Sequence, residues 1–182
     1  MTDMTPHDYA RAIIAQWEGQ LSMDPNDHGN WYKGQLIGSM HGVTGDALER
    51  FLGRPVTAAD IQAVTLDEAA DIAVKVFYEP ELSQLKWTPA VAELLDFEWG
   101  SGEPQTVKNL QRLCGATPDG VMGPQTVAMW NAWADAQGWN ARIKVYQMRV
   151  DFYNMLAQRP EYAPYRQGWL NRAAWAANCW VN

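Results

Sequence analysis

The succession of helix start and stop signals along the chain is the feature that most constrains its fold. Thr5-Pro6-His7-Asp8 combines an N-cap residue, a proline at the first helical position and an acid in the first turn. Gly19 offers a left-handed cap at the end of this first helix. Comparable signals predict helices that begin at Thr65 and Thr88, and helices over 46–52, 104–113, 124–136, 140–158 and 168–178. The sequence therefore predicts a mainly α, all-helical class of fold.

Charge and hydropathy exclude several kinds of partner. Asp and Glu number 21 against 14 Lys and Arg, a formal net charge of −7, and the longest concentration of basic residues is scattered along 142–172 instead of forming a patch. We therefore expect no nucleic-acid partner. The chain has no run of 18 apolar residues, so we expect no stable membrane association. Residues 1–12 contain no apolar core, and we expect no signal peptide and synthesis in the cytoplasm.

One long irregular segment interrupts the helices. Residues 19–44 contain five glycines, several polar residues and Trp31-Tyr32, and they begin directly after Glu18. A loop of this length within a compact domain is usually functional. Part of residues 30–43 is compatible with a small β-hairpin.

Glu18 is the first candidate for chemistry. It is predicted to lie at the C-terminal end of the first helix, where the helix dipole disfavours the charged carboxylate and favours the protonated form that a general acid needs. Asp27 lies nine residues further on, in a polar turn. Two carboxyl groups in such different surroundings can act as the acid and the base of a glycosidase. The alternative is that Glu18 is an ordinary helix-end residue and the aspartates cap turns; spacing alone favours this alternative.

Three ordered motifs then point to a family. Residues 17–19, 24–30 and 38–44 resemble the active-site segments of glycoside hydrolase family 108 lysozymes, and 96–126 is similar to their associated peptidoglycan-binding segment. The resemblance covers about residues 7–172. It implies a lysozyme-like helical fold with one long irregular active-site loop or small β-hairpin.

The resemblance also implies a division into domains. Residues 1–95 would form the catalytic lobe. Residues 96–182 would form a helical peptidoglycan-binding segment that packs on this lobe in one compact unit.

The resemblance assigns roles to individual residues. Glu18 matches the proton donor of an N-acetylmuramidase, which cleaves the β-1,4 bond between N-acetylmuramic acid and N-acetylglucosamine. Asp27 is the expected second carboxylate, and Asp24 is the competing choice. Ser39 stands where the family usually has a threonine that helps to hold the attacking water.

Further residues are candidates for substrate contact. Trp31, Tyr32 and Trp99 are expected in or near loops, where they would stack on sugar faces or simply pack. His41 would touch substrate or occupy a turn. The three histidines have no metal-ligand spacing, and residues 24–35 fit a calcium loop only in part, so we expect no metal and no cofactor.

The biological role implied by the resemblance is that of a phage endolysin for host-cell lysis. Such a monomeric enzyme would be made in the host cytoplasm and would reach periplasmic peptidoglycan (murein) after a holin-type release. Two alternatives remain open: a non-catalytic peptidoglycan-binding or secretion-accessory protein, and a lytic transglycosylase, which needs only one carboxylate.

Overall fold

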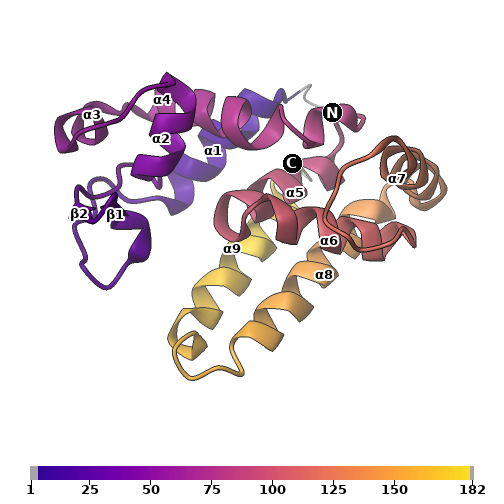
Figure 1. The fold of residues 1–182 in the computed structure, drawn as a ribbon. Helices are drawn as coiled ribbons and strands as arrows, with labels where there is room; N and C mark the ends of the chain where they lie inside the picture. The colour runs from indigo at the N-terminus through magenta and orange to yellow at the C-terminus, as the bar shows by residue number, and fades with distance from the viewer. Residues whose placement is uncertain (1–3, 181–182) are drawn as a thin grey trace. The chain divides into compact units, whose positions relative to one another are not determined.

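The computed structural model describes residues 4–180, and most of them are helical (Figure 1). The α-helices are α1 (Pro6–Trp17), α2 (Gly45–Leu52), α3 (Ala58–Ala63), α4 (Leu66–Ile72), α5 (Pro89–Ser101), α6 (Glu103–Cys114), α7 (Pro124–Gln137), α8 (Asn140–Leu156) and α9 (Arg166–Asn178). Shorter helical segments are η1 (His28–Asn30), the π-helical η2 (Ala73–Tyr78), η3 (Leu82–Gln84) and η4 (Ala163–Tyr165). Strands β1 (Trp31–Tyr32) and β2 (Gln35–Leu36) pair antiparallel in the register Trp31↔Leu36 and Tyr32↔Gln35. The predicted class, mainly α with one small hairpin, is confirmed.

Contacts divide the described chain into two compact units, residues 4–80 and residues 81–180. The domain boundary expected between residues 95 and 96 lies inside α5. That division concerned function and stays a prediction, because compactness does not show which residues catalyse and which bind. None of the helices within residues 4–180 combines the length and the apolar character needed to cross a membrane.

The first unit is built around α1, which packs against α4 and η2. Thr5 is the expected N-cap, and with Asp8 it forms a capping box in which each side chain bonds the other residue's backbone N–H. The prediction of a left-handed cap at Gly19 is wrong. The helix ends instead at Glu18, which adopts an extended conformation, while the backbone of Gly19 has no positive φ.

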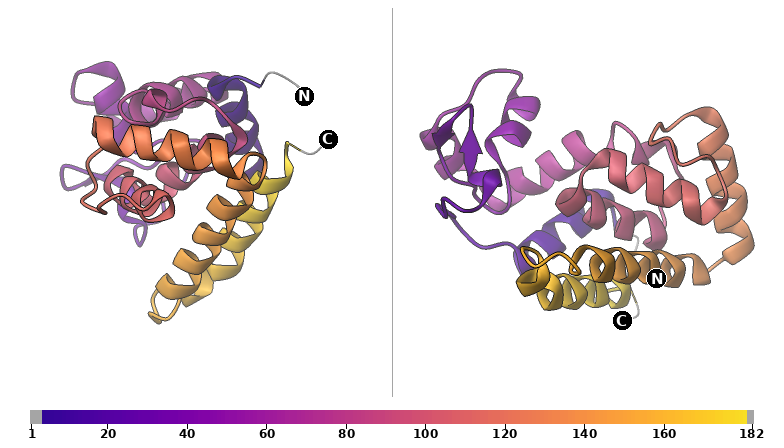
Figure 2. Two further views of the ribbon diagram at one scale, coloured as in Figure 1. Left: turned by 90° about the vertical axis from the view of Figure 1, so that its right-hand side faces the viewer. Right: turned by 60° about the horizontal axis from the view of Figure 1, so that its bottom comes forward.

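Helix α5 is the centre of the second unit. Every residue from 90 to 98 is buried, and α5 packs against α6, α8 and α9. Helices α8 and α9 lie side by side in both views of Figure 2. A helix that is buried on all sides must find partners for its polar side chains inside the unit.

Those partners are arginines from the neighbouring helices. Arg149 on α8 donates to the carboxylate of Asp96, and Arg172 on α9 donates to the same carboxylate at 2.8 Å. Burial alone would raise the pKa of Asp96, but the charges of Arg172 and Arg149 hold it below its usual range. Arg149 lies 3.9 Å from the carboxylate of Glu93, and burial raises the pKa of Glu93 to about 8 against this opposing charge.

Candidate active site

The first unit places Glu18 at the end of α1, as the sequence predicts. Its backbone N–H donates to the carbonyl of Ile14 at 2.9 Å and closes the last turn of the helix. Its extended conformation then turns the chain away from the helix axis. The Glu18 side chain is half-buried, so one part of it packs on the unit and another part faces solvent.

The segment after Glu18 lies beside the segment that carries Ser39. Ser22 and Ser39 exchange two backbone hydrogen bonds, of 2.8 and 3.0 Å. Gly38 makes this approach possible: its φ is +83°, and a Cβ there would lie 2.7 Å from the carbonyl oxygen of Ser22. Ser39 is therefore held opposite a residue only four positions after Glu18, with 8% of its surface exposed.

A buried asparagine, Asn30, organises the rest of the loop. Its Nδ2 donates to the Ser22 hydroxyl and to the carbonyl of Asp24, both at 3.0 Å. The backbone carbonyl of Asn30 accepts the N–H groups of Ile37 and Gly38, also at 3.0 Å. Sequence reasoning noted Asn30 only as the last residue of a motif. No local signal shows that this one residue, through its side chain and its backbone carbonyl, joins the two halves of the loop.

Both candidate second carboxylates cap turns. Asp24 Oδ1 accepts the backbone N–H of Asn26 at 2.9 Å, and Asp27 Oδ1 accepts that of Gly29 at 2.9 Å. Both side chains are exposed. These hydrogen bonds fit the turn-capping alternative. The catalytic role of Asp27, or of Asp24 in its place, stays a prediction.

Two tight turns shape the exposed side of the loop. Lys33-Gly34 joins β1 to β2, and His41-Gly42 joins Met40 to Val43, which form an antiparallel β-bridge. All four turn residues have positive φ, as type I′ hairpin turns require at both central positions. His41 therefore occupies a turn, and its contact with substrate stays a prediction.

The three aromatic candidates have different surroundings. Trp31 is 42% exposed, and its ring N–H donates to the carbonyl of Pro25 at 2.9 Å. Tyr32 is only 5% exposed, and its hydroxyl accepts the N–H of Val56, which favours the packing alternative. Trp99 is half-buried and lies in the last turn of α5 in the second unit, near the end of the helix at Ser101.

The arrangement offers proton-transfer chemistry at a solvent-facing loop. It provides one carboxyl group at a helix end, a hydroxyl group on the adjacent segment and two exposed carboxylates. Within residues 4–180, His, Cys, Asp and Glu side chains form no group of three that could hold a metal ion. Carboxyl groups of this kind are what glycosidases use to cleave a glycosidic bond.

Comparisons with known proteins agree with this chemistry. The family model described as glycosyl hydrolase 108 matches residues 11–102, and a model described as a predicted peptidoglycan domain matches residues 105–174. The solved structure of Brucella abortus SagA is similar over 96% of this chain and 94% of its own, with 24% identity and a TM-score of 0.72. No curated protein sequence matches significantly.

Proposed function

This chain belongs to the glycosyl hydrolase 108 family, and from that premise we propose that it is an N-acetylmuramidase. As a glycoside hydrolase with a peptidoglycan domain it is a peptidoglycan hydrolase. The proposed bond is the β-1,4 linkage between N-acetylmuramic acid and N-acetylglucosamine. The observation that carries the proposal is the position of Glu18, at the end of α1 and directly before the solvent-facing loop.

In the proposed reaction, Glu18 donates its proton to the glycosidic oxygen while positive charge develops on the sugar ring. Asp27, or Asp24, stabilises this charge or activates a water molecule, and the hydroxyl group of Ser39 helps to hold that water. A retaining enzyme would instead use the second carboxylate as a nucleophile. The anomer released first distinguishes the two courses.

One observation favours a second candidate, a lytic transglycosylase. Asp24 and Asp27 are already engaged in capping turns, and a transglycosylase needs only a single carboxyl group. In that reaction the 6-hydroxyl of the muramic acid displaces the leaving sugar, and the product carries a 1,6-anhydro ring. The chemical nature of the new end therefore separates the two candidates.

The test is digestion of purified murein by the wild type, Glu18→Gln and Glu68→Gln, with the products read by mass spectrometry. Glu68 lies in α4 of the same unit and serves as a matched control. We expect reducing muramic-acid ends from the wild type and the control, and a loss of about 10²- to 10⁴-fold for Glu18→Gln.

Other products would change the assignment. Anhydro ends from the wild type would make the enzyme a transglycosylase. Binding to murein without any cleavage would leave the non-catalytic alternative. The phage context, the holin-type release from the cytoplasm and the monomeric state stay predictions from the sequence.

A further inference from the structure

Besides the loop after Glu18, a groove between α6 and α8 is a candidate ligand-binding site. It has a volume of about 680 Å³. Every residue that lines it lies between 105 and 155, within the range matched by the predicted peptidoglycan domain. Its lining includes Asn109, Arg112, Leu113, Lys144, Met148 and Phe152.

Asn109 supplies an unused hydrogen-bond donor to this groove. The residue is 6% exposed, and its Oδ1 accepts from Arg112 Nη1 at 2.9 Å. Its Nδ2 donates to no acceptor within the described residues 4–180. A buried donor without an acceptor destabilises a protein, so this amide group favours a ligand that brings an acceptor oxygen.

Two cations give the groove its charge. Arg112 and Lys144 are both exposed, and neither forms an ion pair with a carboxylate in the part of the chain that the structure describes. The one carboxylate that lines the groove, Asp151, accepts a hydrogen bond from Gln147 at 3.2 Å. In a protein of net charge −7, this local excess of positive charge favours a carboxylate as the acceptor.

The floor of the groove is apolar. Leu113, Met148 and Phe152 are half-buried there, and Met155 at one end is 57% exposed. Such a floor suits methyl and methylene groups better than the hydroxyl groups of a glycan. The ligand therefore combines a carboxylate with short aliphatic side chains.

We propose that this groove binds the peptide stem of peptidoglycan through one of its free carboxylates. The stem carries both the free carboxylates and the aliphatic side chains that the groove fits, whereas the lactyl carboxylate of the glycan is consumed in its amide bond to the stem. This inference rests on the proposed function, because it makes peptidoglycan the shared ligand of the two units. The inference adds to the proposed function by naming the part of the polymer that the second unit binds.

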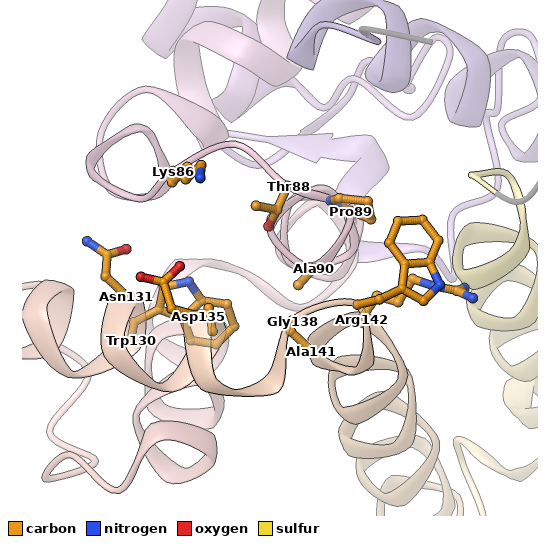
Figure 3. Close-up of a pocket in the computed structure, with 12 residues that line it drawn as sticks. Lys86, Thr88, Pro89, Ala90, Trp130, Asn131, Asp135, Gly138, Ala141 and Arg142 are labelled. Atoms are coloured by element: carbon orange, nitrogen blue, oxygen red, sulfur yellow. The ribbon is translucent and has the colours of Figure 1, made fainter. Parts of the chain in front are cut away.

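A second cavity in the same unit provides a control. It has a volume of about 490 Å³, and in it Lys86 faces Asn131 and Asp135 across the opening (Figure 3). Arg142 also lines this cavity, but its guanidinium group donates to the carbonyl of Ala177 and lies over the ring of Trp139, and Asp135 offsets the charge of Lys86. Lys86→Gln removes the same charge as Lys144→Gln but from the other cavity.

The test is titration calorimetry of the full chain with three soluble probes: a synthetic stem tetrapeptide, the same peptide with its carboxylates converted to amides, and the stem-free disaccharide with its lactyl carboxylate converted to an amide. We expect the tetrapeptide to bind and the amidated peptide to bind at least about tenfold more weakly. Lys144→Gln and Arg112→Gln should each raise Kd by about five- to tenfold, and Lys86→Gln by less than twofold. Lys144 is exposed and lacks the hydrogen bond of Arg112 to Asn109, so its replacement leaves the fold intact.

Three results would overturn the inference. They are no binding of the tetrapeptide at millimolar concentration, equal binding of the amidated peptide, and a weakening by Lys86→Gln as large as that by Lys144→Gln. If the disaccharide bound as tightly as the tetrapeptide, the groove would bind the glycan and not the stem. No bond is cleaved in this experiment, so an active hydrolase without stem binding contradicts only this inference, and stem binding without hydrolysis contradicts only the proposed function.

Discussion

The two units use their carboxyl groups in opposite ways. In the first unit, Glu18, Asp24 and Asp27 lie at the surface or half-buried, and the two aspartates bond only to nearby polar groups of their own turn. In the second unit, Glu93 and Asp96 are fully enclosed by helices and face arginine side chains. Groups of the first kind are accessible to a substrate. The buried carboxyl groups of the second unit hold α5, α8 and α9 together.

This contrast bears on how active sites are recognised. A strongly shifted pKa in a cleft often marks a catalytic group, although structural ion pairs produce the same signature. Glu93, whose pKa is raised to about 8, lines neither of the two cavities described above. In this protein the loop after α1 identifies the candidate acid, and the perturbed carboxyl group belongs to the scaffold.

The largest expected effect comes from removing the arginine that serves both buried carboxylates. Arg149→Met leaves Asp96 and Glu93 with fewer partners and should lower the free energy of unfolding by about 3–5 kcal/mol. The control, Arg159→Met, breaks an exposed pair with Glu161 and should cost less than about 1 kcal/mol. Urea denaturation followed by tryptophan fluorescence measures both. Equal stability of the two variants would show that the buried carboxylates of the second unit depend on their arginine partner no more than an exposed pair does.

A smaller effect is expected from the exposed aspartates. Asparagine is as good an N-cap as aspartate and keeps the side-chain acceptor, so Asp27→Asn and Asp24→Asn remove charge without removing the turn hydrogen bonds. Asp27→Asn should slow murein cleavage by about 100-fold, a barrier increase of about 2.7 kcal/mol. Its stability should change by less than about 0.5 kcal/mol.

The same measurement on Asp24→Asn discriminates between the two aspartates. If Asp24→Asn lost most of its murein cleavage while Asp27→Asn kept full activity, Asp24 and not Asp27 would be the second carboxylate. Full activity of both variants would support the transglycosylase.

The smallest effect concerns Glu93 and depends on pH. The folded protein holds the proton of Glu93 up to about pH 8, whereas the unfolded chain releases it near the ordinary value of 4.5. The stability that this proton contributes is therefore complete below pH 4.5 and is lost between pH 4.5 and 8. Glu93→Gln cannot lose it, so its free energy of unfolding should fall less than that of the wild type between pH 4 and pH 9.

Unfolding of wild type and Glu93→Gln across this range checks the prediction, and pH 4 supplies the internal control. A difference that stays constant from pH 4 to pH 9 would show that the effect of the substitution is packing and not titration.

Much of the helical framework could be predicted because its signals are local. Thr5, Thr65 and Thr88 cap the helices that they were expected to open, and Gly53 and Gly115 adopt the left-handed conformation after α2 and α6. Helix α3 was missed although Thr57 and Asp60 form the same capping box as the first helix. Its six residues are too few for a hydrophobic period to stand out.

The rest depends on contacts between distant residues. The π-helical turn of η2 follows α4 without any break in the sequence pattern, and it forms where this segment packs against α1. The motif alone led to Glu18, but the linking role of Asn30 requires the folded path of the whole loop. The pairing of Asp96 with Arg149 and Arg172 likewise spans more than 50 residues.

The hydrogen bonds of Asn30 have a consequence for the medium in which the protein works. Salt weakens the attraction between exposed charges, whereas hydrogen bonds between neutral groups inside a protein are hardly affected by dissolved ions. The four hydrogen bonds that Asn30 makes across the loop join amide, hydroxyl and carbonyl groups only. The path of the loop that carries Ser39 is therefore held by contacts that ionic strength hardly changes, even where the surrounding polymer is itself charged.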